Sequence, residues 1–449
     1  MFIPNIPAAL AGISFLLFTS CTSLRQWAQL PKKEPTPTPE PAPVVEPVKD
    51  SIHTADNFLE NLLAQYPEHF KDVLEKRNEL NVQVIYTQVD RGANGIPALK
   101  HHYFNVDSNR YFYPASTVKL PVALLALQRL NELKDKNINK YSTLLTEKAL
   151  SRQTAVLNDP TTPDGRPSIA HYIKKILMVS DNDAYNRLYE FLGRGYINKE
   201  LQKKGYTEVQ LLHRLQVFLS QEENRHTNPV QFVDSRNKLL YYQPMQYDTN
   251  TYAARTDSIG QAYYRGDSLV QQPMNFSQRN KIYLESLHHI LISLVFPNKV
   301  YASQRFNLTE DDRNFVLKYM SQLPTESTWP PYSDEPEKYY PAYCKFLLHG
   351  ADKGELPKNI RIFNKVGDAY GHLLDVAYIV DFEKKVEFFV SAVIYCNSDG
   401  VLNDDKYDYD SIGFPFLKNL GQVLYDYEMK REKKHVPDLQ ALKFLYDNP

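Results

Sequence analysis

The 449-residue sequence has little cysteine, no excess of either charge and no long hydrophobic run. Three cysteines are too few for a disulfide-stapled scaffold. The 52 Lys and Arg residues balance 53 Asp and Glu residues, and the resulting net charge of -1 argues against a nucleic-acid partner. The most apolar stretch, Ala8 to Phe18, is too short to span a bilayer comfortably. What the sequence does have is 43% hydrophobic residues, which is ample for a large core.

The N-terminal apolar stretch has the length of a signal-peptide core, and Thr19, Ser20 and Cys21 follow it. Small residues leading into a cysteine resemble a bacterial lipoprotein signal. The resemblance implies that residues 1–21 are a signal peptide and that Cys21 carries a lipid anchor to the membrane. A plain signal peptide cut nearby, or an N-terminal anchor, is the alternative, because no Lys or Arg precedes the apolar stretch.

Residues 22–50 are rich in proline, which favours an extended polyproline conformation over a packed core. We interpret them as a linker that holds the globular body away from a membrane. Together with Cys21, the linker predicts a cell-envelope protein that faces the periplasm or the cell surface.

The globular body is expected over residues 51–430, followed by a C-terminal tail at 431–449. Helical spacing at 58–74 precedes two strand-like segments at 82–107, and two more strands and an amphipathic helix occupy 372–428. Strands at both chain ends around a helical middle predict an α+β fold in which both ends share one antiparallel sheet.

The stretch "FYPASTVKLPVALLAL", residues 112–127, contains the most informative pair, Ser116 and Lys119. Residues three apart share a helix face, so the Lys119 amine can reach the Ser116 hydroxyl. A lysine in apolar surroundings loses solvation, its pKa falls, and it can act as a base. An N-cap role for Ser116, with Lys119 reaching solvent, is the alternative reading of this pair alone.

Two further motifs follow in order. Ser180-Asp181-Asn182 stands between two helical patterns, and Lys365-Val366-Gly367 ends a strand-like run. With S-T-V-K at Ser116, they match the S-x-x-K, S-D-N and K-T-G signature. The chain therefore resembles the serine β-lactamase and penicillin-binding protein superfamily, and is most similar to its class A β-lactamase-like branch. The resemblance implies a five-stranded antiparallel sheet formed by both chain ends, flanked by helices, with an all-α middle region.

The resemblance also implies a role for each matched residue. Ser116 would be the acylated nucleophile, Lys119 would remove its proton, and Ser180 would pass a proton to the leaving nitrogen. Lys365 would supply positive potential to Ser180 and to a substrate carboxylate. The implied substrate-binding residues are Asn182, Val366, Gly367 and Asp368. Gly367 would let substrate lie along the strand, and the backbone N–H groups of Ser116 and Asp368 would form an oxyanion hole.

The chain departs from the family pattern at three places. The interval from Ser180 to Lys365 is long, with surplus blocks at 217–275 and 325–345 that either reshape the cleft or are surface loops without a catalytic role. Gln216 stands where the glutamate that activates the hydrolytic water is expected, and an amide cannot serve as that base. Glu208, Glu222 and Glu223 are possible substitutes. Val366 replaces a hydroxyl residue that would bind a substrate carboxylate.

These features predict a serine hydrolase that acts on an amide bond, in a β-lactam or a peptidoglycan-type peptide, through an acyl-enzyme on Ser116. A D-Ala-D-Ala carboxypeptidase or esterase, and a non-catalytic cell-wall-binding lipoprotein, are the alternatives. No cofactor or metal is expected. The pairs His101-His102 and His288-His289 do not predict a shared metal, and residues 403–410 read as a solvated loop. Whether Cys344 and Cys396 pair is left open by the sequence.

Overall fold

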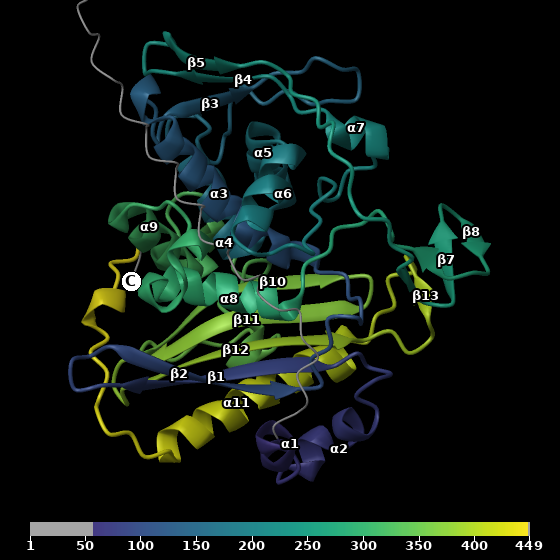
Figure 1. The fold of residues 1–449 in the computed structure, drawn as a ribbon, viewed down its shortest axis with the longest axis vertical. Helices are drawn as coiled ribbons and strands as arrows, with labels where there is room; N and C mark the ends of the chain where they lie inside the picture. Colours follow the sequence, from purple (N-terminus) through teal and green to yellow (C-terminus); the bar gives the residue numbers. More distant parts are fainter. Residues whose placement is uncertain (1–56, 448–449) are drawn as a thin grey trace, which may run out of the picture. The chain divides into compact units, whose positions relative to one another are not determined.

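The computed structural model describes residues 57–447, and a five-stranded antiparallel sheet lies at the centre of this part of the chain (Figure 1). The strands, in their order across the sheet, are β10 (Ile360–Ala369), β11 (His372–Asp381), β12 (Val386–Tyr395), β1 (Gln83–Arg91) and β2 (Pro97–Phe104). β1 pairs with β12, with Ile85 opposite Ser391, so both chain ends build the sheet as predicted. β10 is an edge strand, which leaves one side of its backbone open.

Helices cover both faces of this sheet, which explains why β11 and β12 are buried along almost their whole length. Alternate residues of β11 enter opposite cores: Tyr378 belongs to one hydrophobic cluster and Ile379 to the other. Three helices share the cluster of Ile379: α1 (Phe58–Leu63), α2 (Pro67–Glu75) and α11 (Phe414–Lys430). α8 (Leu284–Val295) and the helical middle of the chain pack on the other face.

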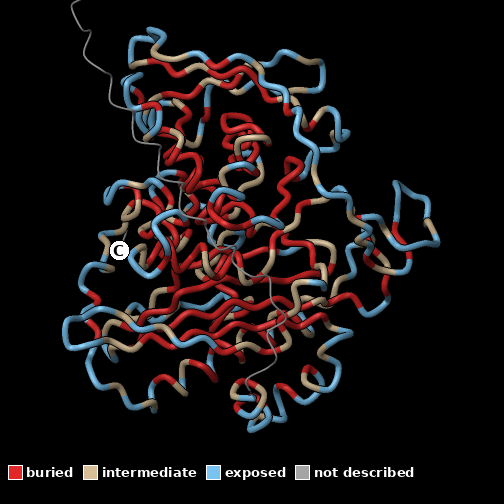
Figure 2. The backbone as a smooth tube through the Cα atoms, in the orientation of Figure 1, coloured by how far each residue is buried: buried red, intermediate tan, exposed pale blue. Residues whose placement is uncertain are grey.

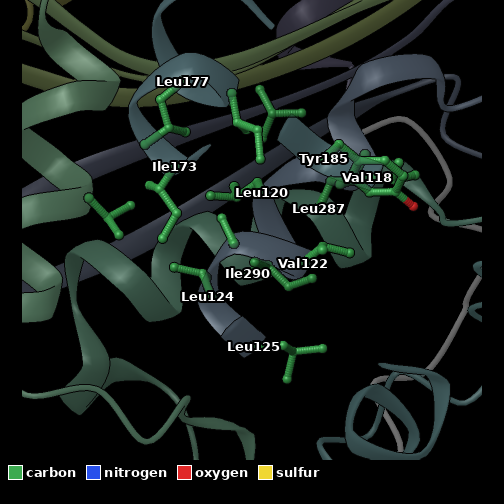
Figure 3. Close-up of a cluster of buried hydrophobic side chains, with 14 of the residues drawn as sticks. Val118, Leu120, Val122, Leu124, Leu125, Ile173, Leu177, Tyr185, Leu287 and Ile290 are labelled. Carbon is green, nitrogen blue, oxygen red and sulfur yellow. The ribbon is translucent and has the colours of Figure 1, made fainter. Parts of the chain in front are cut away.

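The helical middle is built around α3 (Lys119–Glu132), whose residues from Lys119 to Gln128 are all buried. A helix that is apolar all round has to be surrounded by other elements. Figure 3 shows Leu120 and Leu124 of α3 among Ile173, Leu177 and Ile290. The neighbouring helices are α4 (Ile169–Val179), α5 (Asn182–Leu192), α6 (Arg194–Lys203) and α9 (Glu310–Ser321). Most residues of this helical region and of the large sheet are buried, whereas the exposed residues lie at the periphery (Figure 2).

The fold class is confirmed, but the prediction of an all-α middle needs a correction. A three-stranded sheet joins β3 (Thr143–Thr146), β4 (Val230–Val233) and β5 (Leu239–Gln243). Short strands occupy the rest of the 217–275 block: β6 (Ser258–Ile259), β7 (Ala262–Arg265), β8 (Ser268–Val270) and β9 (Met274–Asn275). β7 also pairs with β13 (Val401–Leu402), which follows the large sheet. Backbone N–H and C=O groups of this Tyr-rich block thus form hydrogen bonds by strand pairing with distant segments. Helical periodicity in the sequence could not predict that pairing.

The remaining helices are short, α7 (Gln221–Arg225) and α10 (Phe346–His349). The described part of the predicted tail packs against α9 and β10. Tyr446 OH lies 2.9 Å from Ser321 Oγ, and the Arg361 guanidinium stacks on the Tyr446 ring at 4.2 Å. The predicted signal peptide, Cys21 and the linker lie outside residues 57–447. Over the described range, no helix combines the length and apolarity that crossing a membrane would require.

Candidate active site

Ser116 and Lys119 lie at the junction of a short 3-10 helix, η1 (Ala115–Val118), with α3. Thr117 Oγ1 ties this turn by donating to Pro114 O at 2.6 Å. Neither helix has a side-chain cap, and Lys119 has no exposed surface. The alternative of an N-cap serine with a solvent-reaching lysine is therefore wrong.

The Lys119 amine is surrounded by four oxygen atoms. It lies 2.8 Å from Ser116 Oγ, 3.2 Å from Ser180 Oγ and 2.7 Å from Asn182 Oδ1, and it also donates to the Ser180 carbonyl. A neutral amine has two N–H groups and one lone pair. The two carbonyl-type oxygens, of Ser180 and of the Asn182 amide, can only accept, so they occupy both N–H groups. The lone pair is then left for the Ser116 hydroxyl proton.

Burial favours this neutral form. It lowers the pKa of Lys119 well below that of a free lysine, and the neighbouring charge of Lys365 lowers it further. Burial also lowers the pKa of Lys365. A buried amine beside a second amine is a weaker base than a free lysine, so the neutral form of Lys119 that can accept a proton is favoured.

Ser180 occupies the turn between α4 and α5, which explains the Ser-Asp-Asn sequence locally. Ser180 adopts a left-handed conformation (φ 57°) as the C-cap of α4. Asp181 caps α5 by accepting from Ala184 N at 2.7 Å, so its role is structural. The turn directs Ser180 Oγ between the two amines, 2.8 Å from Lys365 Nζ and 3.2 Å from Lys119 Nζ.

β10 contributes the third motif and lies directly against the nucleophile turn. A Cβ atom on Gly367 would come within 3.0 Å of Pro114 O and 3.1 Å of Ser116 N. Gly367 was expected to make room for substrate, but the close approach of η1 already requires a residue without a side chain. Lys365 and Gly367 share this face of the strand. Val366 is buried in the cluster on the opposite face, away from Ser116 and Lys119.

The family model described as "Beta-lactamase enzyme family" matches residues 66–252. That segment carries the Ser116–Lys119 pair and the Ser180–Asn182 turn. The resemblance to the serine β-lactamases is confirmed. The match indicates a serine β-lactamase-like hydrolase. The comparison with curated proteins found no match.

Several solved β-lactamase structures align with most of the chain at low identity. A β-lactamase from Xanthomonas campestris has 13% identity and a TM-score of 0.44, covering 82% of this chain and 98% of its own. The chromosome-encoded β-lactamase of Vibrio parahaemolyticus has 12% identity and a TM-score of 0.45, covering 80% and 99%. A class A β-lactamase from Clostridium kluyveri has 15% identity and a TM-score of 0.42, covering 81% and 98%.

In this β-lactamase-like site, Gln216 lies beside the Ser-Asp-Asn turn. Its Oε1 accepts from Asn182 Nδ2 at 2.8 Å, and Asn182 Oδ1 accepts from Lys119. Gln216 is exposed and adopts a positive φ of 55°. An amide therefore lies next to Asn182, and it has no basic atom that could activate water.

The residues that hold this loop in place were not predicted from the sequence. Asn186, one helical turn after Asn182 on α5, accepts from Leu215 N at 2.8 Å and donates to Leu215 O at 2.9 Å. Arg214 is buried and forms an ion pair with Glu190 at 3.1 Å. The i, i+4 spacing of the two asparagines was the available signal, since it puts both amides on one face of α5.

The three glutamates considered as replacements for the missing base have other contacts or positions. Glu223 forms a capping box with Ser220 and an ion pair with Arg152 at 3.1 Å. Glu222 lies near His226, at 3.5 Å. Glu208 is exposed in the turn that follows α6. The contacts of Glu222 and Glu223 are within or beside α7 and do not involve Ser116 or Lys119.

The two surplus blocks have defined surroundings in the fold. A cavity of about 710 Å³ lies between the first block and the turn after β10, lined by Phe218, Tyr263, Arg279 and Tyr370 among others. In the second block, Tyr332 is buried and packs against Tyr339, with the ring centroids 4.7 Å apart. Whether the blocks reshape the cleft or are surface loops without a catalytic role stays a prediction.

The histidines and cysteines that were considered as possible metal or disulfide sites are the remaining candidates. Thr87 Oγ1 bridges His101 Nδ1 at 2.7 Å and His288 Nε2 at 2.8 Å. Cys344 and Cys396 are both buried free thiols. Across residues 57–447 there is no group of three or more His, Cys, Asp or Glu side chains arranged to hold a metal ion.

Proposed function

We propose that this β-lactamase-like hydrolase cleaves an amide bond, in a β-lactam or a peptidoglycan-type peptide, through a covalent acyl-enzyme on Ser116. One observation carries the proposal. The fully buried Lys119 amine has both N–H groups taken by carbonyl-type oxygens and its lone pair left for Ser116 Oγ, 2.8 Å away. That arrangement activates a nucleophile, because a serine hydroxyl is a weak nucleophile without an adjacent base.

In the acylation step, Ser116 Oγ bonds to the substrate carbonyl carbon while its proton passes to Lys119. The oxyanion would accept from the backbone N–H groups of Ser116 and Asp368, which the proximity of Gly367 to Ser116 N supports. The carbon–nitrogen bond then breaks. The leaving nitrogen takes the Ser180 hydroxyl proton, and Ser180 regains a proton from the Lys119 ammonium. The products are an acyl-enzyme and an amine, which is released from a peptide substrate and stays attached to the acyl group in an opened β-lactam.

Lys365 and Asn182 assist from opposite sides of this reaction. Lys365, 2.8 Å from Ser180 Oγ, stabilises negative charge on that oxygen during proton transfer. Asn182 holds the substrate carbonyl by exchanging its Nδ2 contact with Gln216 for one with substrate. Deacylation would be slow, because Gln216 cannot activate water.

A D-Ala-D-Ala carboxypeptidase or esterase is the second candidate, and Gln216 favours it, since such an enzyme does not depend on a glutamate at this position. A non-catalytic cell-wall-binding lipoprotein fits less well, because a binding cleft has no use for two buried amines around two serine hydroxyls. Lipid attachment at Cys21 and a cell-envelope location remain part of the proposal, tested by incorporation of labelled palmitate into wild type and Cys21→Ala.

Intact-protein mass spectrometry with benzylpenicillin tests the proposal. We expect the mass of one penicillin to be added, on the peptide that contains Ser116, and to persist for longer than the mixing time. Unmodified protein, or equal labelling of Ser116→Ala, would refute it. Release of D-alanine from a D-Ala-D-Ala peptide would distinguish the carboxypeptidase.

A further inference from the structure

The cavity of about 710 Å³ beside the first surplus block begins where the strand next to the nucleophile ends. Tyr370, which lines the cavity, directly follows β10, and Gly367 on that strand lies against Ser116 N. Phe218, on another wall, follows closely after Gln216, which lies beside the Ser-Asp-Asn turn. An extended chain rises about 3.3 Å per residue, so Tyr370 lies about 10 Å beyond Gly367 along the strand.

A turn from Phe276 to Arg279 is fixed between this cavity and the nucleophile. Arg279 lines the cavity, and its backbone N–H donates to Phe276 O at 2.9 Å. The buried Phe276 ring packs against the rings of Tyr370 and Tyr113, with centroids 5.1 Å and 5.6 Å away. Tyr113 belongs to the segment that leads into Ser116, so the turn that carries Arg279 packs on both segments around the nucleophile.

Arg279 is half-buried, and its guanidinium is unpaired. Within the described part of the chain, that guanidinium forms no hydrogen bond, ion pair or aromatic ring contact. Arg255, by contrast, donates to backbone carbonyls of the same turn and forms an ion pair with Asp257 at 3.1 Å. Arg265, which also lines the cavity, donates to Tyr263 OH at 2.8 Å. The Arg279 guanidinium is therefore available to a ligand.

The rest of the lining shows which ligand would fit. Phe218 is 90% exposed and, with Met274, offers apolar surface. Asp405 is the acidic residue among the lining residues, and two arginines outnumber it. Pockets of this kind hold an apolar group and orient it through a few polar side chains. Because a guanidinium pairs its N–H groups with both oxygens of a carboxylate, the cavity suits an apolar chain that ends in a carboxylate.

We infer that this cavity receives the acyl part of the substrate and that Arg279 binds a carboxylate on it. The leaving nitrogen takes its proton from Ser180, which lies 2.8 Å from Lys365. Lys365 precedes Gly367 on β10 and the cavity lies beyond it, so the leaving group and the cavity are on opposite sides of Ser116. The inference rests on the proposed function and names the substrate class for the same site.

Two thioesters that share mercaptoacetamide as the leaving group test this selectivity. One has a suberyl acyl group, whose terminal carboxylate lies about as far from the reacting carbonyl as Tyr370 lies from Gly367. The other has the suberyl monoamide, which has nearly the same shape but no charge. The rate of Ser116 acylation is followed by time-resolved mass spectrometry. We expect the acid to react about ten-fold or more faster than the amide, the effect of a charge-assisted hydrogen bond.

Arg279→Gln should bring the acid-to-amide rate ratio close to one. Arg279→Lys should keep part of it, because lysine retains the charge but not the paired N–H groups. Arg236→Gln, which removes an equal charge from the exposed loop between β4 and β5, is the matched control and should leave the ratio unchanged. A wild-type ratio at or below one, no loss in Arg279→Gln, or an equal loss in Arg236→Gln would overturn the inference.

Because the Arg279 side chain has no such contacts, Arg279→Gln should unfold in urea like wild type, and the ratio cancels any general effect on the site. If neither thioester acylates Ser116, the proposed function fails instead. Binding of suberic acid monoamide to Ser116→Ala, measured by NMR titration, then decides. Loss of that binding in the Ser116→Ala, Arg279→Gln double variant supports the subsite, and equal or absent binding overturns it.

Discussion

Gln216→Glu places a carboxylate where the structure has an amide. The two side chains have the same shape, so the introduced carboxylate could accept the same hydrogen bond from Asn182 Nδ2, which Gln216 Oε1 accepts at 2.8 Å. Its second oxygen would be free to take a proton from water, because position 216 is exposed. A positioned general base contributes about 10²- to 10⁴-fold, and we expect a gain in acyl-enzyme hydrolysis within that range.

The assay separates the two half-reactions. Ser116 is first labelled with benzylpenicillin, excess reagent is removed, and loss of the added mass is timed. Acylation should respond in the opposite way near neutral pH, because a carboxylate close to Lys119 favours its ammonium form, so the rise of acylation rate with pH moves to higher pH. Gln221→Glu, on exposed α7, adds the same charge as a control. Unchanged hydrolysis in Gln216→Glu would refute the assignment of this loop.

Three further predictions follow from the same geometry. Gly367→Ala should lower the free energy of unfolding by about 1–3 kcal/mol in urea titrations and slow acylation, because its Cβ would meet Pro114 O at 3.0 Å; wild-type behaviour would contradict the close packing. Ser180→Ala should slow acylation by amides by about 10²-fold or more but affect activated esters much less, since only a leaving amine needs the proton; equal losses would exclude the relay. Burial lowers the pKa of Lys345 to about 8. Between pH 8 and 10.5 the unfolded chain therefore holds a proton on this lysine that the folded chain has lost. The free energy of unfolding should rise by about 3 kcal/mol over this range. Lys345→Met should reduce that rise in urea titrations, and an identical pH profile would refute it.

Local features of the sequence predicted part of the centre of the site. The i, i+3 spacing put Lys119 within reach of Ser116, but by itself it left open an N-cap serine with an exposed lysine, and only the two further motifs favoured the buried pair. The meeting of Ser180 and Lys365 depends instead on how α5 and β10 pack, and only the resemblance to a known family predicted it. The match of Gln216 to the family's glutamate also came from that resemblance, and it stays a prediction.

Features set by contacts between distant segments could not be predicted. The hydrogen bonds of Asn186 to Leu215 join a helix to a loop, and no feature of the sequence pairs these two residues. The pairing of β7 with β13 joins the 217–275 block to a segment beyond the large sheet. The reason for Gly367 lies in the approach of η1.

The central claim is that Lys119, uncharged, takes the proton of Ser116. Its most direct test is the rate of Ser116 acylation as a function of pH in wild type and in Lys119→Arg, whose guanidinium does not release its proton. We predict that the wild-type rate rises through one ionisation well below 10.5, the ordinary lysine pKa, and that Lys119→Arg loses both the rate and the ionisation. Equal rates and the same pH profile in the two proteins would contradict the claim.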